Sequence, residues 1–193
     1  MQSPGPRNAI AVILREHEQL STVVEGMRHF VRLLAAGAPV PGLMVFRAML
    51  YYIREYPEQV HHPKEDRYLF TPLRQRTDEF DHVLDQLESQ HARGEMKVRD
   101  LERALTRYEL KGAPALRTLR ALMDEYAEFY ADHRCLEETL ILPAATRLLT
   151  NNDWAEADAA FGANRDPFEG VKLENDLDKL FAMIVKAIPE TEN

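Results

Sequence analysis

The spacing of apolar residues constrains the fold of this chain most, because they recur every three or four positions along almost the whole sequence. In a helix with 3.6 residues per turn, such spacing places these side chains on one face. A half-buried strand would instead alternate apolar and polar residues, and no stretch of useful length does so. The sequence therefore predicts an all-α protein. The stripe of the first helix runs through Ile10, Ile13, His17, Leu20, Val24, Met27, Val31 and Leu34.

Glycine and proline divide this pattern into segments. The stretches AAGAPVPG and KGAP interrupt it, and the pair Thr77–Asp78 carries side-chain oxygens that suit the start of a helix. We therefore expect four long helices, over residues 7–36, 43–75, 77–110 and 115–149. Long helices with short connections are typical of an antiparallel, up-down-up-down four-helix bundle.

The bundle is expected to occupy residues 7–150, and residues 151–193 are expected to be a C-terminal appendage of the same domain. This appendage contains short helices that should pack on the bundle. Its last segment, VKLENDLDKLFAMIVKAI, has an amphipathic pattern. The apolar face of that segment is predicted to pack on the bundle or on another subunit, and the second arrangement would give a homodimer.

Charge and cysteine content narrow the classes of protein. A net charge of −8 argues against binding to nucleic acid or to an anionic membrane surface, since both need a basic face. The single cysteine, Cys135, excludes an internal disulfide and fits a reducing compartment. The N-terminal stretch lacks the shape of a signal peptide, and no segment has the roughly 18 apolar residues of a membrane span. We therefore expect a cytoplasmic protein.

Histidine and glutamate form an internal repeat within this helical pattern. The motif His-x-x-x-Glu occurs as His61 with Glu65 and again as His133 with Glu137. A lone histidine in a helical seam precedes each motif, His17 before the first and His91 before the second. Each half of the repeat is one helical hairpin. A spacing of four residues places both side chains of the motif on one face of the helix.

Four such helices around one axis would bring four imidazoles and two carboxylates to one level. This ligand chemistry suits iron, manganese or zinc, and the cores of helix bundles are known locations for two-metal carboxylate sites. We predict that Glu65 and Glu137 bridge two ions and that two histidines bind each ion, without deciding which histidines pair. The four histidines are His17, His61, His91 and His133.

Other polar side chains near these motifs are expected outside the set of ligands. They should lie at the surface or support the ligands, and they are His29, His62, His82, Glu95, Asp66 and Glu138. Tyr126 and Tyr130 are expected to be core aromatics with hydroxyls near the site, and Cys135 is expected to be structural. Pro63 falls between His61 and Glu65, so we expect a kink there that is confined to this half of the repeat.

The ordered motifs REHEQL, HHPKEDRYLF, LESQHARGE and HRCLEETLILPA resemble the hemerythrin-like, or HHE cation-binding, family, over residues 9–149. The resemblance implies an antiparallel four-helix bundle with a non-haem di-iron centre, bridged by two carboxylates and an oxo or hydroxo group. Oxygen-carrying hemerythrins use five histidines, two of them from His-x-x-x-His on the third helix. Here His91 is followed by Glu95 at that spacing, so one histidine is missing and reversible oxygen carriage is not expected.

The pattern instead resembles bacterial members that handle iron, oxygen, peroxide or nitric oxide. We therefore expect a di-iron protein, with manganese or zinc as substitutes, that binds or reduces a small diatomic or peroxide ligand in sensing or stress defence. Two alternatives stay open. One is a non-enzymatic module that responds to iron or binds a partner. The other is an iron donor or iron–sulfur repair protein, which the absence of a cysteine-bearing N-terminal region disfavours.

Overall fold

The computed structural model describes residues 8–162 and 182–188, and within these ranges every regular element is helical and no strand occurs. The elements are α1 (Asn8–Ala36), α2 (Leu43–Glu55), η1 (Tyr56–His61), α3 (His62–Glu65), η2 (Asp66–Phe70), α4 (Thr71–Arg74), α5 (Asp81–Lys111), α6 (Ala113–Leu136), η3 (Glu137–Ile141), α7 (Leu142–Leu148) and α8 (Asn151–Gly162). The three η elements are π-helical turns. The all-α class predicted from the apolar spacing is confirmed.

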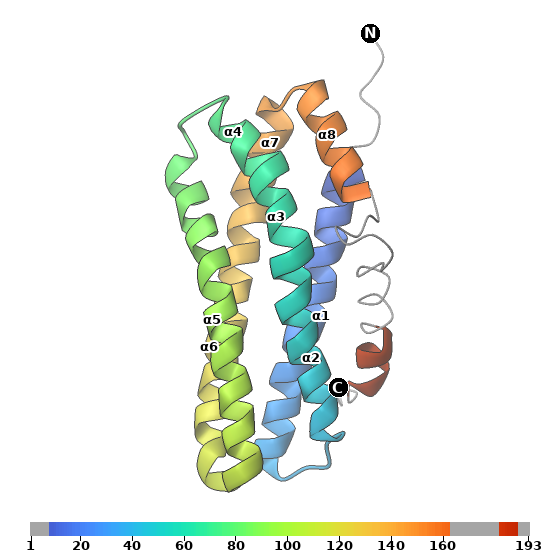
Figure 1. Ribbon diagram of the computed structural model, residues 1–193, viewed down its shortest axis with the longest axis vertical. Coiled ribbons are helices and arrows are strands. Elements are labelled where there is room, and N and C mark those ends of the chain that lie inside the picture. The colour runs from blue at the N-terminus through green and yellow to red at the C-terminus, as the bar shows by residue number, and fades with distance from the viewer. Residues whose placement is uncertain (1–7, 163–181, 189–193) are drawn as a thin grey trace.

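These elements join into four long rods that lie side by side in Figure 1. The first rod is α1, the second runs without a break from α2 to α4, the third is α5, and the fourth runs from α6 to α7. Gly37 and Gly112 end the first and third rods with φ of +66°, a conformation that glycine adopts without steric cost. The third rod begins at Asp81 instead of at Thr77–Asp78, and the Thr77 hydroxyl accepts a bond from the backbone N–H of Glu79 just before the rod.

Buried apolar side chains form two separate clusters inside the rods. The cluster that we call the α2 cluster includes Leu20, Met27, Phe46, Leu101 and Met123. The cluster that we call the α8 cluster includes Ile13, Phe70, Leu84, Ile141 and Trp154. Between them lie the buried polar residues, which we call the polar layer: Glu16, His17, His61, His62, Glu65, Gln90, His91, His133 and Glu137. Apolar packing therefore closes this layer on both sides along the rods.

Each π-helical turn is followed by a proline, and the two features are linked. The residue before each proline donates its backbone N–H five residues back, from His62 to Pro57, from Thr71 to Asp66 and from Leu142 to Glu137. A proline ring clashes with the carbonyl four residues back, and a wider turn moves that carbonyl aside.

Pro63 therefore ends a wide turn. The wide turn η3 and the proline after it in the fourth rod correspond to the later turn η2 and Pro72 of the second rod, not to η1 and Pro63. Within the described rods, only η1 lacks a counterpart in the other hairpin.

The C-terminal elements that the structure describes pack on this chain's own rods. Trp154, Ala157 and Phe161 of α8 belong to the α8 cluster, and Ile184 belongs to the α2 cluster. Residues 163–181, which include much of the predicted last helix, lie outside the described ranges. None of the described helices combines the length and the apolar character needed to cross a membrane.

The carboxylate of Asp158 in α8 accepts a bond of 2.8 Å from the backbone N–H of Ala9 at the start of α1. Because the first N–H groups of a helix have no partner within it, removing this acceptor should destabilise the fold. We expect Asp158→Ala to lower the free energy of unfolding by about 1 kcal/mol. The melting temperature should then fall by about 2–4 °C in a thermal scan. Glu156→Ala, at an exposed position of the same helix, is the control, and equal melting of both variants would contradict a capping role.

Candidate metal centre

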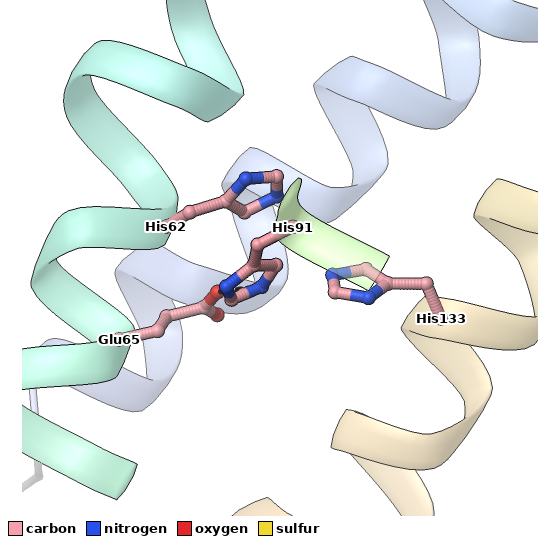
Figure 2. A group of neighbouring side chains, drawn as sticks. All are labelled: His62, Glu65, His91 and His133. Carbon is pink, nitrogen blue, oxygen red and sulfur yellow. Dashed lines mark ion pairs between the residues drawn. The ribbon is translucent and has the colours of Figure 1, made fainter. Parts of the chain in front are cut away.

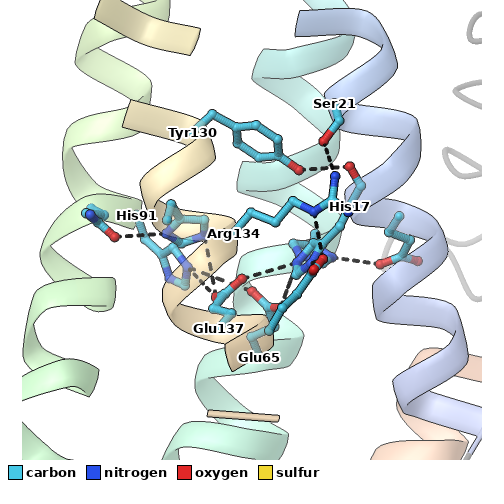
Figure 3. A network of polar contacts seen from close by, with 12 residues as sticks. His17, Ser21, Glu65, His91, Tyr130, Arg134 and Glu137 are labelled. Carbon is cyan, nitrogen blue, oxygen red and sulfur yellow. Dashed lines mark hydrogen bonds and ion pairs between the residues drawn. The ribbon is translucent and has the colours of Figure 1, made fainter. Parts of the chain in front are cut away.

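The six predicted ligands come together in the polar layer, and each is no more than 6% exposed. All four rods contribute: His17 comes from α1, His91 from α5 and His133 from α6. The remaining three lie beside the wide turns, with His61 at the end of η1, Glu65 at the end of α3 and Glu137 at the start of η3. Figure 3 shows four of them, His17, Glu65, His91 and Glu137, pointing towards one another between the rods.

The first group of possible ligands contains His17, His61, Glu65 and Glu137, whose ligand atoms all lie within 4.8 Å of one another. The Nε2 atoms of His17 and His61 are 3.0 Å apart. The same His61 atom lies 3.1 Å from Oε1 of Glu65, and the His17 atom lies 3.1 Å from Oε2 of Glu137. The geometry thus pairs His17 with His61, a choice that the sequence left open.

The second group contains His62, Glu65, His91 and His133, again within 4.8 Å. In Figure 2 the four side chains converge from the second rod, α5 and α6. The imidazole of His62 stacks on that of His91 with centroids 3.8 Å apart, and it meets the His133 ring edge-on. His62 was expected outside the ligand set. It brings a fifth histidine to the centre, from the second rod rather than the third.

Regular helical periodicity predicts that His62 points away from the site if His61 points into it, because consecutive residues of an α-helix point about 100° apart. His61 and His62 instead straddle the boundary between the wide turn η1 and α3. The two imidazoles lie close, with centroids 5.7 Å apart, and both are buried. The only signal in the sequence was the pair of histidines directly before Pro63.

Each of the two carboxylates presents one oxygen to each group. Oε1 of Glu65 faces His61, and its Oε2 lies 3.8 Å from Nε2 of His91. Oε2 of Glu137 faces His17, and its Oε1 lies 3.4 Å from Nε2 of His133. This is the arrangement that a carboxylate needs in order to bridge two ions.

The donor atoms of the second group also fit a bound cation. Three ligand atoms of this group form no hydrogen bond within the described chain, namely Oε2 of Glu65 and Nε2 of His91 and of His133, and the same holds for Oε1 of Glu137 beside them. Burial of polar atoms without partners costs free energy, and a cation between them would satisfy all four. Imidazole nitrogens and carboxylate oxygens are suitable ligands for iron, manganese and zinc.

The Nδ1 atom of four of the histidines donates a hydrogen bond to a neighbouring side chain, which turns Nε2 towards the centre. The four contacts are His17 with Glu138 (3.0 Å), His61 with Glu16 (2.7 Å), His91 with Asp66 (3.0 Å) and His133 with Gln90 (3.1 Å). Asp66 and Glu138 therefore take the supporting role expected of them. Glu16 and Gln90 were not singled out from the sequence, although each directly precedes a histidine of the centre.

The carboxylates of Glu65 and Glu137 are held as anions. Burial alone would raise the pKa of Glu65, but His61 and His17 hold that pKa well below its usual value. Burial and the nearby charge of Glu65 also act to raise the pKa of Glu137, whereas His133 and His17 lower it to about 2. The layer therefore carries buried negative charge that needs positive charge beside it.

Protons supply that positive charge when no cation is bound. Burial disfavours protonation of His17, but the hydrogen bonds and charges of Glu137 and Glu65 outweigh it and raise its pKa to about 10. Burial also disfavours protonation of His61. The charge of Glu65 and the hydrogen bond to Glu16 outweigh burial and raise the pKa of His61 to about 9. A cation at the first group would replace these protons.

The histidines of the second group differ in charge. The pKa of His91 is raised to about 9 in spite of burial, because Asp66 accepts a hydrogen bond from it and the carboxylates of Glu137 and Glu65 lie close by. Burial lowers the pKa of His62 well below its usual value, and the nearby imidazoles lower it further. Burial also lowers the pKa of His133. Two of the three imidazoles are thus neutral, which is the form that binds a metal.

A cavity of about 20 Å³ adjoins the second group, which is enough for one ligand of about the size of a water molecule. Its lining includes His62, His133, Gly94, Phe129 and Tyr130. The hydroxyl of Tyr130 donates a bond of 3.1 Å to the backbone oxygen of His17, so it lies near the site as expected.

Three residues near the motifs lie outside the two groups. Glu95 is exposed and forms an ion pair with Arg99, as expected for a solvated acid. His82 is exposed, also as expected. Cys135 is exposed, which gives no support to the structural role predicted for it.

Comparison with known proteins agrees with this centre. Residues 8–145 match the family described as "Hemerythrin HHE cation binding domain". Uncharacterised proteins of Mycobacterium bovis and Mycobacterium tuberculosis are each 29% identical to the chain over 141 residues. These alignments cover 72% of the chain and 54% of each relative, so the chain spans about half the length of these curated relatives. On the extent of the family match, the chain belongs to the hemerythrin HHE cation-binding domain family.

Proposed function

We propose that the polar layer holds two iron ions and that the protein binds or reduces a small ligand, namely oxygen, peroxide or nitric oxide. The observation that carries this proposal is the orientation of the two carboxylates. Glu65 and Glu137 each point one oxygen towards one group of histidines and the other oxygen towards the second group. A pair of iron ions would supply redox electrons and an open coordination position. Manganese or zinc suits the same donors.

In this proposal, His17 and His61 hold one ion, and His62, His91 and His133 hold the other. As an antiparallel bundle, the four rods would fix the ligands from all sides. Apolar clusters on both sides exclude bulk water, which protects the centre from unwanted reactions. The cavity beside His62 admits only a small ligand, which favours diatomic molecules and peroxide over larger substrates.

His62 also changes what the histidine count implies. With it the centre has five histidines, so the number of histidines no longer argues against reversible binding of oxygen. Binding without turnover and reduction of the ligand therefore both remain within the proposal, and kinetics must separate them.

Iron analysis of protein made in iron-rich cells should find close to two irons per chain. Removal of the metal with a chelator should lower the melting temperature substantially, because the buried carboxylates then depend on protonated imidazoles alone. Glu95→Ala, which removes an exposed acid outside the layer, should change neither result. Equal melting of the loaded and metal-free forms would contradict a metal centre coupled to the fold.

The variants His62→Ala and Glu65→Ala should lose different amounts of metal. His62 faces one group only, so its loss should leave about one iron per chain, whereas Glu65 serves both groups and its loss should remove both irons. The measurement is iron content per folded chain, with His82→Ala as the exposed-histidine control. Retention of two irons by His62→Ala would show that this residue lines the cavity without binding metal.

Stopped-flow mixing tests the reaction itself. The reduced, iron-loaded protein should show a rapid change in absorption with at least one of oxygen, hydrogen peroxide and nitric oxide. Repeated turnover in the presence of a reductant would identify an enzyme, and a single stoichiometric change would identify a carrier or sensor. If none of the three ligands changes the spectrum, the proposed function is wrong even where the metal content is as expected.

A further inference from the structure

The side chains around the two groups are arranged as a repeat with one mismatch. Residues that follow the bridging glutamates, Glu138 and Asp66, are both acids and both bind the lone histidine of the other hairpin. Residues that precede the lone histidines are Glu16 and Gln90, and each binds the second histidine of its own hairpin. A carboxylate in one half therefore stands where the other half has an amide.

This mismatch lies inside the molecule. Glu16 is 4% exposed and Gln90 is 6% exposed, and both belong to the polar layer. The Glu16 carboxylate lies 2.7 Å from Nδ1 of His61, and the Gln90 amide oxygen lies 3.1 Å from Nδ1 of His133. A unit of charge in such a place is poorly screened by water, so it acts strongly on nearby cations.

The two acceptors affect their imidazoles differently. A carboxylate that accepts a bond from Nδ1–H makes the opposite nitrogen a stronger metal ligand, and its charge attracts the ion directly. An amide oxygen orients the ring equally well but carries no charge. Changes in such supporting partners commonly alter metal affinity by about 10- to 100-fold.

We propose that Glu16 and Gln90 make the two metal positions unequal, so that the position of His17 and His61 fills first and the position of His62, His91 and His133 fills second. The inference rests on the two-metal centre proposed above. Its consequence is a stable state with one ion, in which the second position, next to the cavity, is the one that exchanges metal. Glu16 and Gln90 are positioning residues here, because they act through His61 and His133.

Titration of the metal-free, full-length chain with Co(II) under anaerobic conditions tests this order, with visible absorption and calorimetry as readouts. The wild type should bind two ions in two resolved steps. Glu16→Gln should weaken the first step by about 10- to 100-fold. Gln90→Glu should tighten the second step by a similar factor, and a gain in affinity cannot arise from misfolding. Glu95→Gln, at an exposed position of α5, should leave both steps unchanged.

The order is assigned by removing one histidine at a time. In the wild type, His61→Ala should abolish the tight step and His133→Ala the weak step. In the double variant Glu16→Gln/Gln90→Glu, these two assignments should be reversed. Two equal steps in the wild type, or affinities that neither single variant changes, would overturn the inference while leaving the two-metal centre intact. Failure of the wild type to bind two Co(II) ions would instead overturn the proposed centre itself.

Discussion

Two glutamates buried between apolar clusters set the conditions for the rest of this structure. Glu65 and Glu137 are each 1% exposed, and anions in such a place require positive charge and hydrogen-bond donors close by. The imidazoles that surround them provide donors, and the outer acids and amide hold those imidazoles in place. The fold and the candidate centre therefore depend on each other, because the candidate ligands are also the polar part of the core.

Regular helical periodicity was enough to predict much of this. Apolar spacing gave the all-α class, and glycines such as Gly112 marked the ends of rods. The six residues chosen as ligands lie within the two groups and are all buried. They were found because His17 and His91 occupy apolar seams and the other four form two motifs with a spacing of four. Seam position and spacing of four are local properties, which a sequence displays directly.

Features that depend on irregular backbone could not be predicted in this way. His62 faces inward because a wide turn precedes it. A regular α-helix, in which consecutive residues point about 100° apart, would place its side chain away from that of His61. The pairing of His17 with His61 is a contact between rods, which spacing within one rod cannot reveal. The roles of Glu16 and Gln90 were missed for the same reason, since their partners lie more than 40 residues away.

The polar layer also has a consequence for how the rods find their alignment. Apolar side chains fill the core on both sides of it, and apolar surfaces are tolerant of sliding. If one rod moved by a single turn, about 5.4 Å, many apolar contacts could be replaced by similar ones. The same movement of the second rod would part Glu65 from His17 and His91, leaving charges buried without partners. The layer thus selects one register among several of similar packing, and a bound cation would deepen that preference.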